Sequence, residues 1–575
     1  MRFLRRTKIA LANAVWFALC IRQSVLFMVA CKDVKRIQKK VLMEIIRDNR
    51  DTLFGRKHRF NTIREVSDYV SAVPIFTYED YMPYIDLVAM GKVKVLTEKS
   101  VLSLKPTSGS TQATKLIPYT ESLRKDFMKG ILPWIFDLLV SFRKLFFCSA
   151  YWSITPALGN KTVSSGPVTV GFADDSEYFG KFERRLINAI LAVPKEISEI
   201  KDLANFHYAT LLFLVKDRYL GLVSVWNPTF LTNLLRNLPA WFPEIIRNIR
   251  LGTITLPSPS LEDDFVGKRL GKRLAPDPVR ADEILHALPL NAGLPEMCGT
   301  IWPKLTVVSC WGDGASGWYL EELRRILPPV RIQKKGLIAT EGIVSFPTGK
   351  WGCMLSIRSH FFEFIEWDPS DEMKQCLMAH EVEIGRTYVV VLTTNGGLYR
   401  YRTGDLIVVE GFNKSCPIVR FVGRADKISD LFGEKLNEDH ISSILKDEFG
   451  AAGVNPAFFL IAPETFSEGG TRYVLYLEPT PTVAPDVLRS LEERIELKMQ
   501  ENYHYAYCRK LGQLQRLRIF IIEERGTDIH LKTCYSNGLR LGDIKPSVLD
   551  KRTGWSKHFR GEFIKEREPG SAIIR

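Results

Sequence analysis

The chain has 575 residues, of which 46% are hydrophobic and 25% are charged. This composition excludes a disordered chain and predicts a globular protein of two domains, or of one large domain with an appendage. The formal net charge is +14, but residues 1–58 hold fourteen Lys or Arg against four Asp or Glu, a net of +10. The nearly neutral remainder excludes a nucleic-acid-binding body, which would carry basic residues over a working face.

The N-terminus combines this charge with apolar residues. Four basic side chains within residues 1–8 precede two apolar runs, Ile9–Ile21 and Val25–Cys31, which are separated by the polar break Arg22-Gln23-Ser24. Three interpretations of residues 1–31 stay open: an amphipathic helix that packs on the body or lies on a membrane, a membrane span, and a cleaved signal. Arg22 disfavours the span, because a spanning helix needs about 20 uncharged apolar residues.

The ten cysteines are scattered from Cys20 to Cys534 and form no C-x-x-C pair. The sequence therefore indicates free, buried thiols and neither a disulfide framework nor a structural zinc site. Such cysteine usage is typical of a protein that works inside the cell.

A candidate phosphate site follows a predicted helix over Val34–Asp48 and the apolar segment Val101–Leu104. The run Thr107–Lys115 reads T-S-G-S-T-Q-A-T-K. Small hydroxyl residues and a glycine let backbone N–H groups converge on an anion, and the lysine adds a cation for the outer phosphates. The run predicts a triphosphate-binding loop, although a solvated Ser/Thr loop has the same composition.

The middle of the chain, from Tyr119 to Leu290, contains aromatic-rich helical stretches, and we expect an apolar substrate pocket there. An α/β unit then begins, with strands predicted over Leu305–Cys310 and Val330–Gln333 and a helix over Trp318–Leu327. The glycine-containing turn Trp311–Ser316 follows the first strand, at the edge of an α/β sheet where ligands commonly bind.

Two short acidic motifs come next. Glu341, in Ala339-Thr340-Glu341-Gly342, has a carboxylate that can hold Mg²⁺ beside phosphates, and the Thr340 hydroxyl can donate to a phosphoryl oxygen. The second motif is Y-R-Y-R-T-G-D, which ends in Asp405 after a strand predicted over Val389–Thr394. The Asp405 carboxylate can accept both ribose hydroxyls of a nucleotide.

A domain boundary is predicted between residues 425 and 426, just after the Gly423-Arg424 pair. The remaining 150 residues suit one α+β domain. Near its end stands Lys545, followed by a proline.

Together these motifs resemble the adenylate-forming superfamily of acyl-CoA synthetases and luciferases. Its phosphate loop is close to T-S-G-S-T-G-x-P-K, and it carries a Thr-Glu pair, a Gly-Arg-x-Asp segment and a C-terminal lysine in the same order. The opening from Val34 to Ile85 and the Y-R-Y-R-T-G-D string resemble one branch more closely, the Gretchen Hagen family of auxin-responsive acyl acid amido synthetases, of which this chain would be a divergent or bacterial-type member.

The resemblance implies an α/β fold with three parts: the N-terminal helix 1–31, a large adenylating domain 32–425, and a small mobile lid 426–575. It implies that ATP and Mg²⁺ adenylate a carboxylic acid, and that an amine, such as an amino acid, then takes the acyl group. The implied nucleotide and catalytic residues are Ser108, Gly109, Ser110, Thr111, Lys115, Gly314, Ala315, Thr340, Glu341, Asp405, Arg424 and Lys545, with Glu341 as the metal ligand.

Two other functions stay open. The first is a ligase that passes the acyl group to CoA, and the second is a non-enzymatic descendant that only binds a nucleotide. The second is motivated by Gln112, which replaces a glycine of the phosphate loop, and by Leu337 and Ile338, which stand where related enzymes place an aromatic residue. Because ATP is available inside the cell, we expect a cytoplasmic protein, in possible contact with a membrane through residues 1–31.

Overall fold

The computed structural model describes residues 2–107, 115–152, 168, 181–367, 375–425, 428–429, 431–432, 434–466, 470–523, 525–536, 544 and 547–565. The chain divides into two compact units, a large unit, Met1–Val422, and a small unit that begins at Gly423. The predicted boundary between residues 425 and 426 lies three residues beyond this division. Both units combine helices with sheets, which confirms the predicted α/β class.

The strands of the large unit are β1 (Val101–Pro106), β2 (Leu116–Thr120), β3 (Ser149–Trp152), β4 (Leu220–Ser224), β5 (Val307–Cys310), β6 (Arg331–Lys334), β7 (Ser345–Thr348), β8 (Gly352–Leu355), β9 (Phe361–Glu366), β10 (Leu377–Met378), β11 (Thr387–Thr393), β12 (Tyr401–Asn413) and β13 (Cys416–Arg424). A parallel sheet has the order β3-β4-β5-β6, and a seven-stranded sheet has the order β10-β9-β11-β12-β13-β8-β7. Strands β1 and β2 form a separate antiparallel hairpin.

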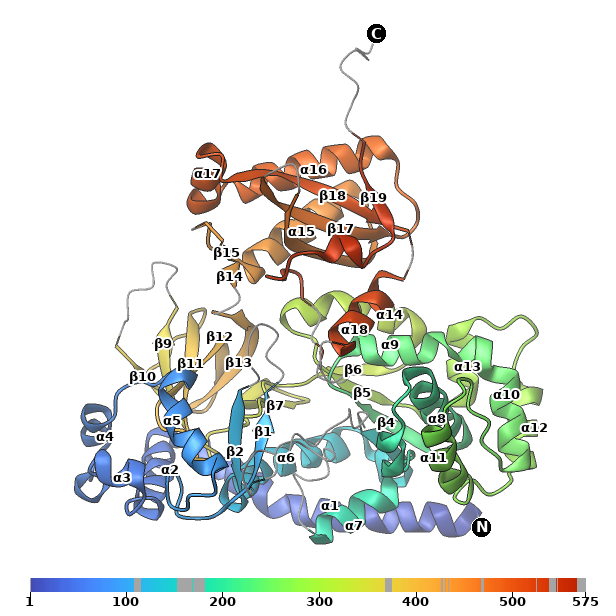
Figure 1. Ribbon diagram of the computed structural model, residues 1–575. Helices are drawn as coiled ribbons and strands as arrows, with labels where there is room; N and C mark the ends of the chain where they lie inside the picture. The colour runs from blue at the N-terminus through green and yellow to red at the C-terminus, as the bar shows by residue number, and fades with distance from the viewer. Residues whose placement is uncertain are drawn as a thin grey trace. The chain divides into compact units, whose positions relative to one another are not determined.

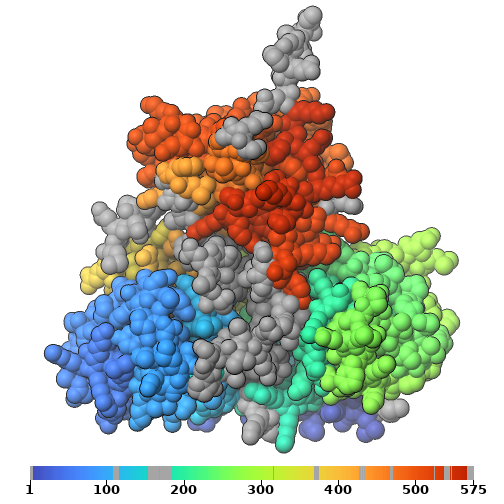
Figure 2. Space-filling model, viewed as in Figure 1, coloured from blue at the N-terminus to red at the C-terminus, as the bar shows by residue number. Residues whose placement is uncertain are grey.

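The helices of the large unit are α1 (Arg2–Ala30), α2 (Val34–Asp48), α3 (Leu53–Lys57), α4 (Val66–Ala72), α5 (Tyr78–Ala89), α6 (Glu121–Ser141), α7 (Lys181–Ile190), α8 (Leu203–Lys216), α9 (Pro228–Arg236), α10 (Leu238–Leu251), α11 (Leu261–Gly271), α12 (Pro278–Ala287), α13 (Leu294–Ile301) and α14 (Leu320–Ile326). Helices α2–α5 gather beside the seven-stranded sheet, and α8–α13 gather beside the parallel sheet (Figure 1). The space-filling view shows the N-terminal region, in blue, and the middle of the chain, in green, on separate parts of the surface of the large unit (Figure 2).

The predicted elements of the α/β unit are confirmed with small shifts at their ends. Strand β5 begins at Val307, two residues later than expected, and α14 runs from Leu320 to Ile326. The turn between them starts as a 3-10 helix at Gly314. Gly314 has φ +57°, a left-handed conformation that glycine adopts without the strain a side chain would cause.

Helix α1 is continuous through the predicted polar break. Ser24 donates its hydroxyl to the Cys20 carbonyl, the Gln23 amide oxygen accepts from Arg358 at 2.8 Å, and Arg22 is exposed. One face of the helix packs on α6 and α7, with Trp16 and Phe27 each 2% exposed. This face belongs to the core of the large unit, because its residues cluster with those of α6 and the seven-stranded sheet.

Asn13 fixes the position of α1 from within this interface. Its side-chain amide donates to the carbonyls of Leu145 and Cys148, at 3.0 and 3.1 Å. At the start of the helix, Arg5 forms an ion pair with the buried Asp217 carboxylate. Of the three interpretations, the packing favours a helix on the body, because a span or a cleaved signal would leave this core face uncovered.

The small unit contains the two short strands β14 (Ile428–Ser429) and β15 (Leu436–Asn437), which pair with each other, and the strands β16 (Pro456–Thr465), β17 (Thr471–Pro479), β18 (Leu514–Ile522) and β19 (Gly561–Phe563). The last four form a sheet in the order β16-β17-β18-β19, in which only the β17–β18 pair is parallel. Its helices are α15 (Glu438–Ala452), α16 (Pro485–Met499), α17 (Tyr503–Lys510) and α18 (Gly526–Ser536). The predicted α+β composition of this part is confirmed.

Candidate active site

The predicted phosphate loop joins β1 to β2, and Ser108, Gly109, Ser110, Thr111 and Gln112 lie outside the described residues. Its two flanks are described. The Thr107 amide donates to the Lys115 carbonyl at 2.9 Å, which extends the antiparallel pairing of β1 and β2 by one step. The flanks therefore approach each other, as a short loop at the end of a hairpin requires.

Tyr78, the first residue of α5, lies beside the end of the predicted phosphate loop. The Lys115 ammonium lies 5.5 Å from the centre of the Tyr78 ring, and the Leu116 amide donates to the Tyr78 hydroxyl at 2.7 Å. Burial raises the pKa of Tyr78, and the negative charges of Asp86, Glu79 and Glu341 add to this shift. Lys115, at the end of the predicted phosphate loop, is thus placed against the start of α5.

Thr340 and Glu341 occupy the tip of a tight turn. The Ala339 amide donates to the Gly342 carbonyl at 3.0 Å, and the Gly342 amide donates back to the Ala339 carbonyl at 3.2 Å. Ile338 and Ile343 form a β-bridge just below these bonds. The two residues are thus presented at the end of a miniature hairpin, with Thr340 half-buried and Glu341 8% exposed.

This arrangement suits a magnesium ion that is held together with a nucleotide. Among the described residues, no group of three or more His, Cys, Asp or Glu side chains is placed to bind a metal ion by itself. Mg²⁺ usually keeps several waters and binds through one or two carboxylates plus substrate phosphates. A single carboxylate at Glu341, next to the Thr340 hydroxyl on the tight turn, fits such a shared site.

The turn after β5 lies at the carboxyl edge of the parallel sheet, as predicted. A Cβ atom at Gly314 would lie 3.4 Å from the Phe421 ring and 3.5 Å from the Val422 carbonyl, so the turn packs closely against β13. The side chain of Ala315 lies outside the description. Next to Gly314, the Asp313 carboxylate pairs with Lys334 at 3.0 Å, which links the ends of β5 and β6.

The Y-R-Y-R string is mainly structural. Arg400 is 5% exposed and binds the Glu363 carboxylate, which is 1% exposed, with its Nη2 2.9 Å from Oε1. It also donates to the carbonyls of Val70 and Val73, at 3.0 and 2.7 Å. The Tyr399 hydroxyl donates to the Leu96 carbonyl at 2.6 Å. These bonds join the string to the N-terminal helices.

The same string also fixes the position of the start of α5, which carries Tyr78. The Phe76 amide donates to the Arg400 carbonyl at 3.0 Å, and the Arg402 amide donates to the Phe76 carbonyl at 2.9 Å. Phe76 stands two residues before Tyr78, so the pairing sets the start of α5. Asp405 lies further along β12 and is 4% exposed.

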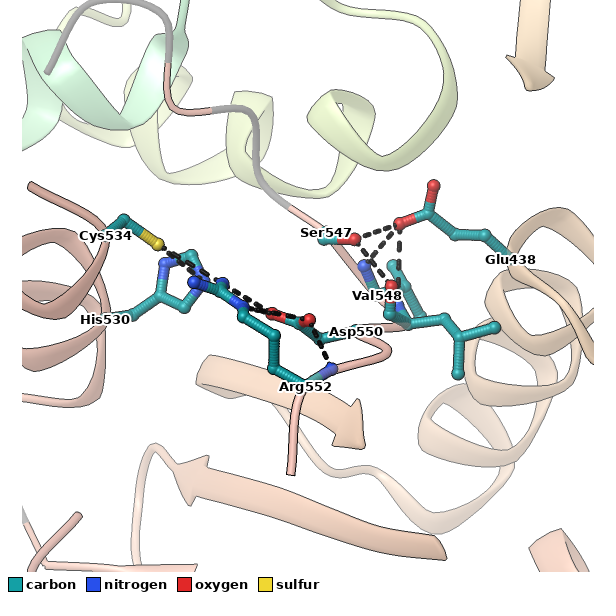
Figure 3. A network of polar contacts seen from close by, with 8 residues as sticks. Glu438, His530, Cys534, Ser547, Val548, Asp550 and Arg552 are labelled. Carbon is teal, nitrogen blue, oxygen red and sulfur yellow. Dashed lines mark hydrogen bonds and ion pairs between the residues drawn. The ribbon is translucent and has the colours of Figure 1, made fainter. Parts of the chain in front are cut away.

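The remaining predicted residues belong to the small unit. Arg424 ends β13 and is half-buried, whereas Lys545 lies outside the described residues. The segment that follows Lys545 is anchored within the small unit (Figure 3). The Glu438 carboxylate, at the start of α15, accepts from the Ser547 hydroxyl at 2.5 Å and from the Val548 amide at 2.9 Å.

Further contacts complete this anchor. The Ile461 amide of β16 donates to the Val548 carbonyl, and the Ile461 carbonyl accepts from the Asp550 amide, both at 2.8 Å. Asp550 in turn forms an ion pair with Arg552 at 2.6 Å, and Arg552 reaches the Cys534 sulfur of α18 (Figure 3). The segment from Ser547 to Arg552 is therefore held by α15, β16 and α18.

An apolar cavity of about 50 Å³ lies in the middle region of the chain, where we expect a substrate pocket. Residues of α6, including Trp134 and Leu138, line one side, and Trp152 and Leu222 of the parallel sheet line another. Asn13 and Trp16 of α1 contribute to its wall. That this space takes a substrate stays a prediction.

Three domain models of one family match the chain. The GH3 family N-terminal domain matches residues 26–332, the central domain matches residues 353–424, and the C-terminal domain matches residues 440–553. Most of α1 precedes the first match.

Curated relatives extend over most of the chain. A jasmonoyl-L-amino acid synthetase, JAR4 of Nicotiana attenuata, is 25% identical over 87% of this chain and 88% of the relative. An indole-3-acetic acid-amido synthetase, GH3.2 of Arabidopsis thaliana, is 24% identical over 82% of this chain and 89% of the relative. Among solved structures, the AtGH3.15 acyl acid amido synthetase in complex with 2,4-DB superposes with a TM-score of 0.79 at 20% identity, covering 92% of this chain and 94% of that chain. This last likeness concerns the fold.

Proposed function

Since the chain belongs to the GH3 family, we propose that it is an acyl acid amido synthetase, which adenylates a carboxylic acid with ATP and transfers the acyl group to an amine. In the first step the carboxylate attacks the α-phosphorus of ATP and pyrophosphate leaves. In the second step the amine attacks the acyl carbon, AMP leaves, and the amine loses a proton. The observation that supports this most is that all three domain models of the family match the chain.

The protein contributes positioning and charge neutralisation more than covalent chemistry. Lys115 neutralises phosphate charge, the Thr340 hydroxyl donates to a phosphoryl oxygen, and Glu341 holds Mg²⁺. When bound, Mg²⁺ supplies further positive charge beside the phosphate oxygens. The other assignments follow the family resemblance: Ser108, Gly109, Ser110 and Thr111 for phosphates, Gly314 and Ala315 for adenine, Asp405 and Arg424 for the ribose and the hinge, and Lys545 for charge on the α-phosphate.

We also propose that the small unit is a lid that brings Lys545 to the nucleotide for adenylation only. The anchor formed by Glu438, Ile461 and Arg552 supports this proposal, because a lysine next to a well-held segment can be positioned precisely. Adenylation should then depend on Lys545 far more than amide formation from a supplied acyl-adenylate does.

The test of the proposed function is a panel of carboxylic acids with the purified protein, ATP and Mg²⁺. We expect pyrophosphate release that requires an acid, and an amide product, detected by mass spectrometry, when amino acids are added. A product that forms only with CoA would replace the amide assignment by a thioester ligase. ATP binding without pyrophosphate release for any acid would support the nucleotide binder.

A second proposal concerns α1. We propose that the protein lies in the cytoplasm and that the outer face of α1, the face that does not pack on the core, contacts a membrane surface. By length and composition, Leu4–Ala30 would be able to cross a membrane, but its inner face is occupied by the core. The outer face is also apolar: Leu4, Leu11, Val25 and Val29 are each more than half exposed. Lys8 and Arg22 are exposed on the same helix. An exposed apolar helix face with basic residues is typical of helices that lie in a membrane interface.

Vesicle binding tests this second proposal. The full-length protein should bind vesicles with anionic lipid at low salt and release them as salt rises, since each basic residue near the surface adds about 1 kcal/mol. Leu11→Ser together with Val25→Ser should weaken binding without loss of folding, because both side chains are exposed. No binding by the unaltered protein at low salt would refute the proposal.

A further inference from the structure

His360 is a buried side chain directly beside the Thr340–Glu341 turn. It stands just before β9 and is fully buried. Its Nε2 accepts a hydrogen bond from the Ile343 amide at 3.1 Å. Ile343 is the residue whose bridge to Ile338 closes the base of the turn.

The ring also sets the space available to the turn itself. A Cβ atom at Gly342 would lie 2.8 Å from His360 Nε2 and 2.9 Å from its Cδ2, closer than such atoms approach in proteins. The backbone at Gly342 therefore rests on the imidazole. Because Gly342 directly follows Glu341, a displacement of the ring would displace the carboxylate.

His360 is itself held on several sides. Gln38 of α2 donates its side-chain amide to the His360 carbonyl at 2.8 Å and accepts from the Phe362 amide at 2.8 Å. The rings of Phe127 and Phe362 meet the imidazole edge to face, with centres 6.0 and 6.1 Å away. The imidazole thus has no room to leave the turn without disturbing α2 and α6.

The protonation state of the ring agrees with this role. Burial lowers the pKa of His360 to about 3, and the positive charge of Lys129 acts in the same direction. A neutral ring that accepts at Nε2 carries its hydrogen on Nδ1. The acceptor for the Ile343 amide is therefore present at all pH values at which the protein would work.

We propose that His360 is a positioning residue, which holds the Thr340–Glu341 turn so that Glu341 and Thr340 meet Mg²⁺ and the phosphates of a bound nucleotide. This proposal rests on the roles proposed above for Thr340 and Glu341. It adds a residue that contacts neither the nucleotide nor the metal and acts through the backbone of the turn. Loss of the ring should therefore raise the Mg²⁺ concentration that ATP binding requires, in addition to any loss of stability.

The experiment measures binding of a non-hydrolysable ATP analogue by the full-length protein at increasing Mg²⁺ concentrations. His360→Leu fills the same buried space with an apolar side chain and leaves the Ile343 amide without its acceptor, so we expect the half-saturating Mg²⁺ concentration to rise about tenfold or more. His360→Gln offers an amide oxygen at similar reach and should stay within about threefold of the unaltered protein.

Two further variants keep the test decisive. His207→Leu removes another buried, neutral histidine of the large unit, on α8, and should lower stability while leaving the Mg²⁺ dependence unchanged. Gly342→Ala places a methyl group against the imidazole, which should displace the turn and raise the half-saturating Mg²⁺ concentration. This variant replaces His360→Leu if His360→Leu does not fold.

If His360→Leu folds and its half-saturating Mg²⁺ concentration is unchanged, the proposal is overturned and His360 is an ordinary core residue. If His360→Leu does not fold, an unchanged value in Gly342→Ala has the same meaning. ATP binding that is independent of Mg²⁺ in the unaltered protein would overturn both this proposal and the role of Glu341. Mg²⁺-dependent binding without acid-dependent pyrophosphate release would instead refute only the proposed reaction. The two failures are thus distinguishable.

Discussion

Two glutamates of the large unit differ in what surrounds their carboxylates. Glu363, on β9, is 1% exposed and binds Arg400 through a buried ion pair, while Arg400 donates to two backbone carbonyls. Glu341 sits at the tip of a tight turn and is 8% exposed. The Glu363 arrangement is closed, because its ion pair lies in the core and uses Arg400 of the Y-R-Y-R-T-G-D string, whereas Glu341 belongs to the Thr-Glu pair that is proposed to hold Mg²⁺. A family-specific string therefore reports packing as readily as chemistry.

The largest expected effect follows from the closed arrangement. Glu363→Gln leaves the Arg400 guanidinium buried without its counter-charge, which should cost about 3–5 kcal/mol of the stability of the large unit. Chemical denaturation followed by tryptophan fluorescence measures the loss. A variant as stable as the unaltered protein would show that the pair is not a structural element.

For Glu341 the expected effect is on activity. Glu341→Gln should lower acid-dependent pyrophosphate release about 100-fold, because a ligand for Mg²⁺ and its negative charge disappear. Glu383→Gln is the control, since the Glu383 side chain is 73% exposed and far along the chain from the turn. Equal activity of the two variants would remove Glu341 from the site.

A third prediction uses pH to separate buried structural groups from site groups. Burial lowers the pKa of His207 to about 4, so the folded state favours the neutral ring. The stability that the neutral His207 ring contributes is fully present above pH 6.5, the approximate pKa of histidine in the unfolded chain. It is lost as the pH falls towards 4. His207→Leu should therefore make the fall of the unfolding free energy shallower by about 1 kcal/mol per pH unit between about pH 6 and 4.5.

Denaturation curves at several pH values give this slope for both proteins. Activity at neutral pH should be the same in the variant. An identical slope in the two proteins would mean that His207 does not stay neutral in the folded state.

The smallest effect is expected at Tyr78. Tyr78→Phe keeps the ring beneath Lys115 but removes the hydroxyl that accepts from the Leu116 amide, so ATP should bind about five- to tenfold more weakly. Titration with ATP and Mg²⁺ measures the change. Tyr84→Phe, which loses only an exposed contact with Lys57, serves as the control and should bind ATP normally.

The sequence allowed the family, the fold class and the ligase chemistry to be predicted, and the domain models and relatives confirm these predictions. Periodicity located α2, β5 and α14 to within a few residues because these elements carry regular apolar patterns. The individual site residues and the domain limits 1–31, 32–425 and 426–575 stay predictions.

Three features followed from tertiary structure alone. Tyr78 and His360 carry no motif of their own, and only folding brings Tyr78 against Lys115 and His360 against the Thr340–Glu341 turn. The Y-R-Y-R string was interpreted through its aspartate, whereas its first tyrosine and arginine bind backbone carbonyls of the N-terminal region. Helix α1 runs through Arg22 because one face packs on α6 while the arginine stays exposed. Local sequence determines which residues favour a helix, a strand or an anion, but contacts between distant segments depend on how all the apolar surfaces are buried together.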